Sequence, residues 1–190
     1  MQRQRAAFIE ARQECDPSAL LVVDDSGRHQ ALARADGRAP RGPRAPGAKP
    51  VPRGRHVTMV GAWGLVGVVA AMMVAGLVDG AALLAFVQEV LGPPRHPGQV
   101  VRLDHLKAHQ VAGVREAIAA VGGRRLDLPP DSPDVSPSEA GWSHIKAMWR
   151  TKAARTLERL WEASTEACAA ITSQDAQGGF THAGDRVQSN

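Results

Sequence analysis

The longest uncharged stretch of the chain, Val57 to Val78, limits its possible folds more than any other feature. As a helix, its 22 residues would be about 33 Å long, enough to cross a bilayer core of about 30 Å. However, the stretch holds seven Val and four Gly, which favours buried β-strands over a membrane helix. We therefore predict a two-stranded hairpin with its turn at Ala62–Leu65, and a membrane-spanning helix remains the alternative.

Composition sets the broad class of protein. The 190 residues suffice for one domain with a sizeable core, and 44% hydrophobic with 22% charged residues excludes wholesale disorder. A net charge of +4 indicates a polyanionic partner. Cys15 and Cys168 lie far apart, without Cys or His neighbours at metal-binding spacing, so we expect a cytoplasmic protein with no zinc site. The first residues are too charged for a signal peptide.

Two short apolar segments are each followed directly by an acid. Leu20–Val23 leads into Asp24, and Val100–Leu103 leads into Asp104. We interpret both segments as strands that end at these acids. In open α/β sheets the carboxyl ends of strands form the edge where ligands bind, so both acids are candidate site residues.

The remaining pattern alternates helices with strands. We predict one further strand at Arg125–Leu128, a polar and weakly structured tail after Ser173, and helices near residues 1–19, 80–91, 109–121, 137–149 and 155–171. Apolar stripes on the last two helices, which include Trp142, Trp149 and Trp161, predict core positions. The order of elements predicts an α/β fold in which a mixed sheet is flanked by helices.

Residues 28–55 form a basic segment that cannot build a core. Eight Lys or Arg stand here against one acid, Asp36, among five Pro and four Gly. One interpretation is a solvated loop, and the other is a surface that contacts nucleic-acid phosphates. The candidate DNA-binding residues, in this segment and in the helix near 137–149, are Arg38, Arg41, Arg44, Lys49, Arg53, Arg55, Lys146 and Arg150.

A third acid, Glu139, stands at the predicted start of a helix. With Asp24 and Asp104 it could hold hard cations, which phosphodiester chemistry uses to bind the attacking and leaving oxygens. Each acid also has a plain structural interpretation. Ser136 to Glu139 matches a helix capping box, and the two Asp residues could be ordinary turn acids.

The combined pattern resembles the DDE transposases of bacterial insertion sequences in the mariner superfamily. The similarity covers roughly residues 15–185 and rests on the surroundings of Asp24, Asp104 and Glu139 and on the basic segment Gly37–Gly42. Between the second and third acids lie 34 residues, the spacing typical of this superfamily. Five residues depart from the family pattern. Asp25 replaces Glu, His105 replaces Asn beside the second acid, Ser136 replaces Asn, and Asp36 and Asp131 each replace Tyr.

The resemblance implies an RNase H-like catalytic domain over residues 20–185, with 28–55 as a basic loop and 1–19 as the helical remnant of a linker. It also implies that Asp24, Asp104 and Glu139 bind two Mg²⁺ or Mn²⁺ ions, with Asp25, His105 and His109 supporting them. The expected reaction is cleavage at element ends and insertion at a TA target, by a homodimer in the synaptic complex.

Family members usually carry helix-turn-helix modules before the first acid, whereas 23 residues precede Asp24 here. We therefore expect a catalytic half whose DNA-recognition half is supplied by frameshifting or in trans. The alternatives are a partial remnant that binds DNA without catalysis and a small membrane protein spanning at 57–78. Phosphate loops, nucleophile elbows and Cys/His pairs are absent from the sequence, which disfavours other hydrolases.

Overall fold

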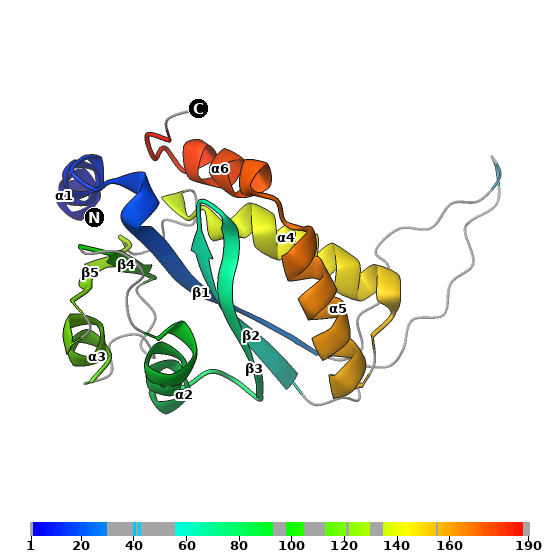
Figure 1. The fold of residues 1–190 in the computed structure, drawn as a ribbon. Helices are drawn as coiled ribbons and strands as arrows, with labels where there is room; N and C mark the ends of the chain where they lie inside the picture. The colour runs from blue at the N-terminus through cyan, green and yellow to red at the C-terminus, as the bar shows by residue number, and fades with distance from the viewer. Residues whose placement is uncertain are drawn as a thin grey trace.

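The structure is a computed structural model that describes residues 2–29, 40, 42, 56–92, 98–104, 113–120, 122–129, 135–154 and 156–187. A five-stranded sheet in the order β3-β2-β1-β4-β5 lies at its centre (Figure 1). The strands are β1 (Leu20–His29), β2 (His56–Gly64), β3 (Gly67–Ala75), β4 (Val100–Leu103) and β5 (Arg124–Asp127). Strands β1, β2 and β3 pair antiparallel, whereas β4 and β5 extend the sheet parallel to β1. The predicted mixed α/β sheet is confirmed.

The uncharged stretch forms the hairpin of β2 and β3, as predicted. Its turn lies at Leu65 and Val66, so the turn predicted at Ala62–Leu65 is wrong, because Ala62, Trp63 and Gly64 pair with β3. Among the described residues, no helix is long and apolar enough to span a membrane.

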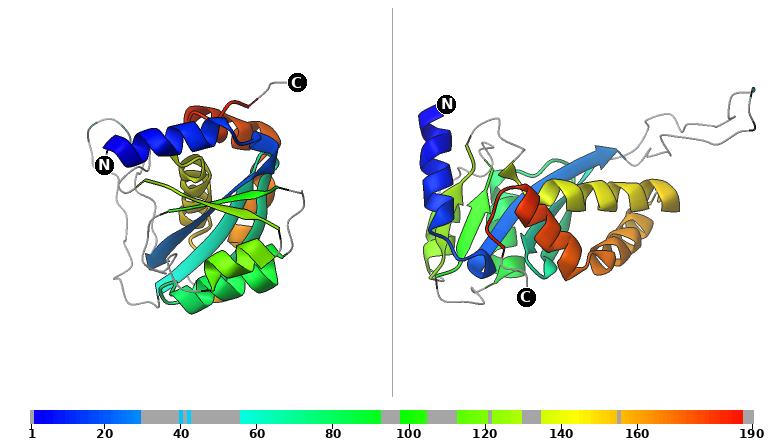
Figure 2. Two further views of the ribbon diagram at one scale, coloured as in Figure 1. Left: turned by 90° about the vertical axis from the view of Figure 1, so that its left-hand side faces the viewer. Right: turned by 90° about the horizontal axis from the view of Figure 1, so that it is seen from above.

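Helices cover both faces of the sheet (Figures 1 and 2). One face carries α4, α5 and α6, and the other carries α2, α3 and the π-helical turn η2. The helices are α1 (Gln2–Gln13), η1 (Pro17–Ala19), α2 (Gly80–Ala85), η2 (Phe86–Leu91), α3 (Val114–Ala120), α4 (Ser138–Lys152), α5 (Leu157–Ala170) and α6 (Ser173–His182).

Alternation along β1 divides the core between these two layers. Leu20 and Val22 face α4, α5 and α6, whereas Val23 faces α2, η2 and α3. Trp142 and Trp149 of α4 are buried against the sheet as their stripe predicts. The stripe on α5 was less reliable, because Trp161 is 51% exposed.

The prediction of a weakly structured tail after Ser173 is wrong. Residues 173–182 form α6, whose start is stabilised by a capping box between Thr172 and Asp175. The hydroxyl of Thr172 accepts a hydrogen bond from the backbone N–H of Asp175, and the Asp175 carboxylate accepts one from the backbone N–H of Thr172. Phe180 anchors the other end of α6 in the core.

Candidate active site

The first two acids lie in or directly after adjacent parallel strands, Asp24 within β1 and Asp104 after the last residue of β4. Val23 of β1 is the register partner of Leu103 of β4. Asp24 and Asp104 are the next residues after these partners. Asp24 does not end its strand as predicted, since β1 continues to His29 as a partner of β2. Even so, the two acids lie close enough for the charge of Asp104 to act on Asp24.

The side chain of Asp24 is held by helix α4. Its Oδ2 accepts hydrogen bonds from Ser138 Oγ at 2.6 Å and from Trp142 Nε1 at 3.0 Å. Its Oδ1 accepts the backbone N–H of Asp25 at 2.8 Å. Ser138 and Trp142 are four residues apart, so they lie on the same side of α4 and face one carboxylate oxygen together.

A glycine opposite Asp24 makes this contact possible. Gly61 of β2 is the register partner of Asp24. A Cβ at this position would lie 3.3 Å from both Trp142 Cη2 and Trp63 Nε1, which is tighter than normal packing. The two indole rings themselves meet edge to face with centroids 5.1 Å apart.

The environment of Asp24 disfavours its charged form. Burial raises the pKa of its carboxyl above the ordinary value of 3.8, and the negative charge of Asp104 raises it further. Hydrogen bonds from Ser138, Asp25 and Trp142 lower this pKa but do not offset the burial. Carboxylate oxygens are the ligands that Mg²⁺ and Mn²⁺ prefer, so a divalent cation beside this pair fits its chemistry.

Glu139 lies in the first turn of α4, directly after Ser138, and its side chain is exposed. Within the described residues, no group of three His, Cys, Asp or Glu side chains is close enough to hold a metal ion. The structure therefore brings together Asp24 and Asp104. Glu139 follows Ser138, which binds Asp24, but its side chain does not form a three-acid cluster with the pair.

The capping-box interpretation of Glu139 is wrong. Pro137 occupies the N-cap of α4, and no side chain caps the helix. The hydroxyl of Ser136 instead lies 2.8 Å from that of Ser138. Glu139 therefore has no capping role here.

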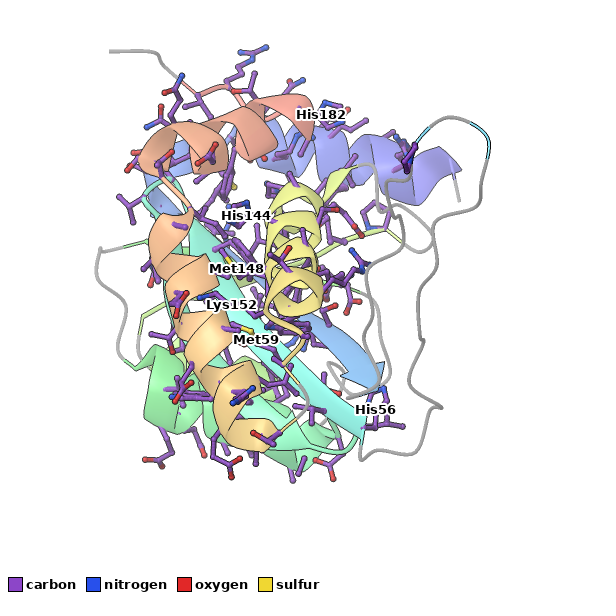
Figure 3. All side chains as sticks on the ribbon, turned by 90° about the vertical axis from the view of Figure 1, so that its right-hand side faces the viewer. His56, Met59, His144, Met148, Lys152 and His182 are labelled. Carbon is purple, nitrogen blue, oxygen red and sulfur yellow. The ribbon has the colours of Figure 1, made fainter. Side chains whose placement is uncertain are left out.

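Two predicted DNA-binding residues lie on α4, where their positions can be assessed. Lys146 and Arg150 follow Glu139 by seven and eleven residues, so they lie on the same stripe of the helix. Figure 3 looks onto α4, α5 and α6, with His144, Met148 and Lys152 of α4 labelled. Lys152 pairs with Glu166 of α5 at 2.6 Å, which ties the two helices at the surface.

Other predicted site residues fall outside the described part of the chain or beside the acids. Asp25 is half-buried next to Asp24 and contributes its backbone amide. The residues outside the described ranges are Arg38, Arg41, Arg44, Lys49, Arg53, Arg55, His105 and His109.

Sequence reasoning missed Ser138 and Trp142 as partners of Asp24. Their spacing of four residues beside Glu139 was visible, but Trp142 was interpreted as core alone. It is both, because its ring is buried and its N–H reaches the acid.

Comparison with known proteins identifies the family. Residues 19–161, which include Asp24, Asp104 and Glu139, match the model of the DDE superfamily endonucleases. The chain belongs to this family. No curated protein matches this DDE endonuclease chain in sequence.

Solved structures of the Mos1 mariner transposase share the fold. The paired-end complex with the left transposon end has a TM-score of 0.69 at 15% identity, over 97% of this chain and 58% of that one. The Mos1 strand transfer complex gives 0.70 at 16% identity, over 95% and 58% of the two chains. The Mos1 catalytic domain alone gives 0.57 at 12% identity, over 98% and 93%. The predicted RNase H-like fold is confirmed, and this chain spans just over half the length of the Mos1 chains in these two complexes.

Proposed function

We propose that this chain is the catalytic domain of a transposase that cuts DNA at the ends of a mobile element and joins those ends to a target. The observation that carries the proposal is the pair Asp24, within β1, and Asp104, directly after the adjacent parallel strand β4. The helix that bears Glu139 is hydrogen-bonded to Asp24. Membership of the DDE endonuclease family supports the assignment of these three acids.

Asp24, Asp104 and Glu139 would hold two Mg²⁺ or Mn²⁺ ions. When bound, such ions activate the attacking hydroxyl and stabilise the leaving oxygen of the phosphodiester. The structure of Mos1 paired ends was solved with Mg and with Mn, which supports the choice of metal. Glu139 would complete the ligand set from its place one residue after Ser138, by a movement of its exposed side chain.

The remaining residues would bind and orient DNA. Lys146 and Arg150 share the stripe of Glu139, so a phosphate backbone at the acids could continue along α4. The basic residues of segment 28–55 would add phosphate contacts without sequence choice.

The proposed reaction requires DNA and protein partners. The catalytic domain would bind element ends and a TA target, together with a second copy of the chain in a synaptic complex, in the cytoplasm. A separately encoded helix-turn-helix half would supply recognition of the ends.

A nicking assay on DNA that carries the element ends tests the catalytic assignment. In Mg²⁺, Asp104→Asn and Glu139→Gln should each lower the cleavage rate by more than about a hundredfold, because each loses a ligand to ions worth several kcal/mol in the transition state. Asp127→Asn and Glu158→Gln are matched controls. Asp127 ends the neighbouring parallel strand, and Glu158 is an exposed acid in the first turn of α5. Full activity in Asp104→Asn and Glu139→Gln would disprove the assignment.

The exposed position of Glu139 and the absence of a closed three-acid cluster among the described residues favour one second candidate, a DNA-binding protein without catalysis. Thermal unfolding with and without Mn²⁺ separates the two. A metal at 100 times its dissociation constant should stabilise an active domain by about 2.7 kcal/mol, and a non-catalytic remnant should show no such gain.

A further inference from the structure

The carboxylate of Asp24 is bound asymmetrically by its surroundings. Oδ2 accepts two side-chain hydrogen bonds, from Ser138 and Trp142, whereas Oδ1 accepts one backbone hydrogen bond, from Asp25. Each carboxylate oxygen has two lone pairs in the plane of the group. The donors within the described part of the chain therefore occupy both lone pairs of Oδ2 and leave one on Oδ1.

Both donors are fixed by the core. Ser138 is fully buried and Trp142 is 2% exposed, so neither can exchange its partner for water at low cost. The ring of Trp142 packs against Trp63, above the space that Gly61 leaves open. Packing of the ring thus fixes the direction of its N–H, which points at Asp24.

We propose that Ser138 and Trp142 are positioning residues that occupy Oδ2 of Asp24 and leave Oδ1 as the oxygen for a divalent cation. This inference rests on the proposed function and adds a role for two residues that are not among the three acids. The hydrogen bond from Ser138 also couples the positions of Asp24 and Glu139, because Ser138 directly precedes Glu139 in α4. A shift of α4 that moves Glu139 must also move the donors to Asp24.

The helix provides a matched control for each donor. Trp149, also buried in α4, donates its indole N–H to Ser164 at 2.8 Å, away from the acids. Trp142→Phe and Trp149→Phe therefore remove the same kind of ring and hydrogen bond from one helix. Ser138→Ala and Ser164→Ala form the second pair, since both hydroxyls are buried hydrogen-bonding groups.

The experiment measures Mn²⁺ binding to the full chain by calorimetry, with tryptophan emission recorded in the same titration. Trp142→Phe and Ser138→Ala should each weaken Mn²⁺ binding by about 10- to 100-fold, the usual cost of losing a group that orients a metal ligand. The metal-dependent change in emission should vanish in Trp142→Phe alone. Trp149→Phe and Ser164→Ala should bind Mn²⁺ as the wild type does. Circular dichroism confirms that each variant is folded, and Ser138→Ala retains every indole if Trp142→Phe does not fold.

Two results would overturn the inference, and they are distinguishable. If the wild type binds Mn²⁺, Asp24→Asn abolishes binding, and both donor variants bind normally, then the positioning role fails while the proposed function stands. If the wild type and Asp24→Asn bind Mn²⁺ equally weakly, then the metal site itself fails, and the positioning role fails with it.

Discussion

Asp24 is a buried carboxyl group whose charged form is disfavoured by burial. Its pKa is raised above 3.8 by desolvation and by Asp104, so its ionised form costs stability in the folded chain. Enzymes commonly accept such a cost at sites that bind charged ligands. The free energy of unfolding should therefore reveal this residue without any assay of activity.

We expect the metal-free protein to lose stability as the pH rises through the raised pKa of Asp24. Below pH 3.8 the group is protonated in both the folded and the unfolded chain, so its contribution to stability is fully present. Above that pH the unfolded chain releases its proton first, so the contribution declines. The decline stops once Asp24 is ionised in the folded chain as well. Asp24→Asn has no such group and serves as the reference.

Urea unfolding of both proteins in EDTA, over a series of pH values, measures the difference. Between pH 3.8 and the raised pKa of Asp24, the free energy of unfolding of the wild type should fall relative to that of Asp24→Asn. At higher pH the difference between the two proteins should stay constant. Asn keeps one acceptor oxygen, and loss of the hydrogen bonds to the other oxygen adds only an offset that does not depend on pH. Parallel curves throughout would contradict the raised pKa.

Sequence reasoning reached some residues of the site because local chemistry marks them. An acid after a short apolar segment, as at Asp24 and Asp104, is visible in any reading of the chain. The role of Trp142 was not visible, because an amphipathic stripe says which face of a helix is buried and nothing about what its N–H meets. The alternative role of Glu139 as a cap failed for a related reason, since Ser136 binds Ser138 instead of the helix amides.

Two glycines within helices show how packing decides the effect of one methyl group. Gly141 of α4 lies against Trp63, and a Cβ there would approach Cη2 of that ring at 2.5 Å. Gly178 of α6 has no atom within 4 Å of the equivalent point. Both are glycines in helical backbone, where alanine would normally be preferred.

We predict opposite signs for the two alanine substitutions. Gly141→Ala should destabilise the protein by about 1–3 kcal/mol through overpacking. Gly178→Ala should stabilise it by about 0.5–1 kcal/mol through helix propensity alone. Thermal or urea unfolding measures both changes, and a stabilising Gly141→Ala would show that Trp63 is not packed against α4 as described. Because Trp63 also contacts Trp142, Gly141→Ala should weaken Mn²⁺ binding as well, while Gly178→Ala should not.

At the level of elements, prediction succeeded where one local pattern dominates. The hairpin of β2 and β3 followed from β-branched residues broken by glycine, and α4 and α5 followed from their apolar stripes. Helix α6 was missed because its residues are polar and include Gly178 and Gly179. Its stability depends on the Thr172 capping box and on the burial of Phe180, and the second of these is a tertiary contact.

The two ends of the chain meet around a buried ion pair that no local pattern indicates. Arg102 of β4 donates from Nη1 and Nη2 to the two carboxylate oxygens of Asp185, at 3.0 and 2.8 Å. Both side chains are fully buried, and they are 83 residues apart in sequence. Arg12 of α1 lies 3.8 Å from the same carboxylate and donates to the carbonyl of Ala183. The guanidinium of Arg102 also stacks 5.3 Å from the ring of Phe8.

This arrangement links α1, β4 and the segment after α6. Arg102 precedes Asp104 by two residues. Such long-range pairing could not be predicted from composition or periodicity, because neither specifies which charged residues become buried together.

We predict that Asp185→Ala destabilises the protein by about 3–5 kcal/mol, since it leaves buried guanidinium groups without a counter-charge. Arg102→Met should cost less, because Arg12 remains as a partner for Asp185 and the apolar stem is retained. Glu166→Ala is the control: it breaks the ion pair with Lys152, which is short but exposed, and should cost no more than about 1 kcal/mol. Urea unfolding at neutral pH measures all three. Equal costs for Asp185→Ala and Glu166→Ala would show that the buried carboxylate does not hold the two ends of the chain together.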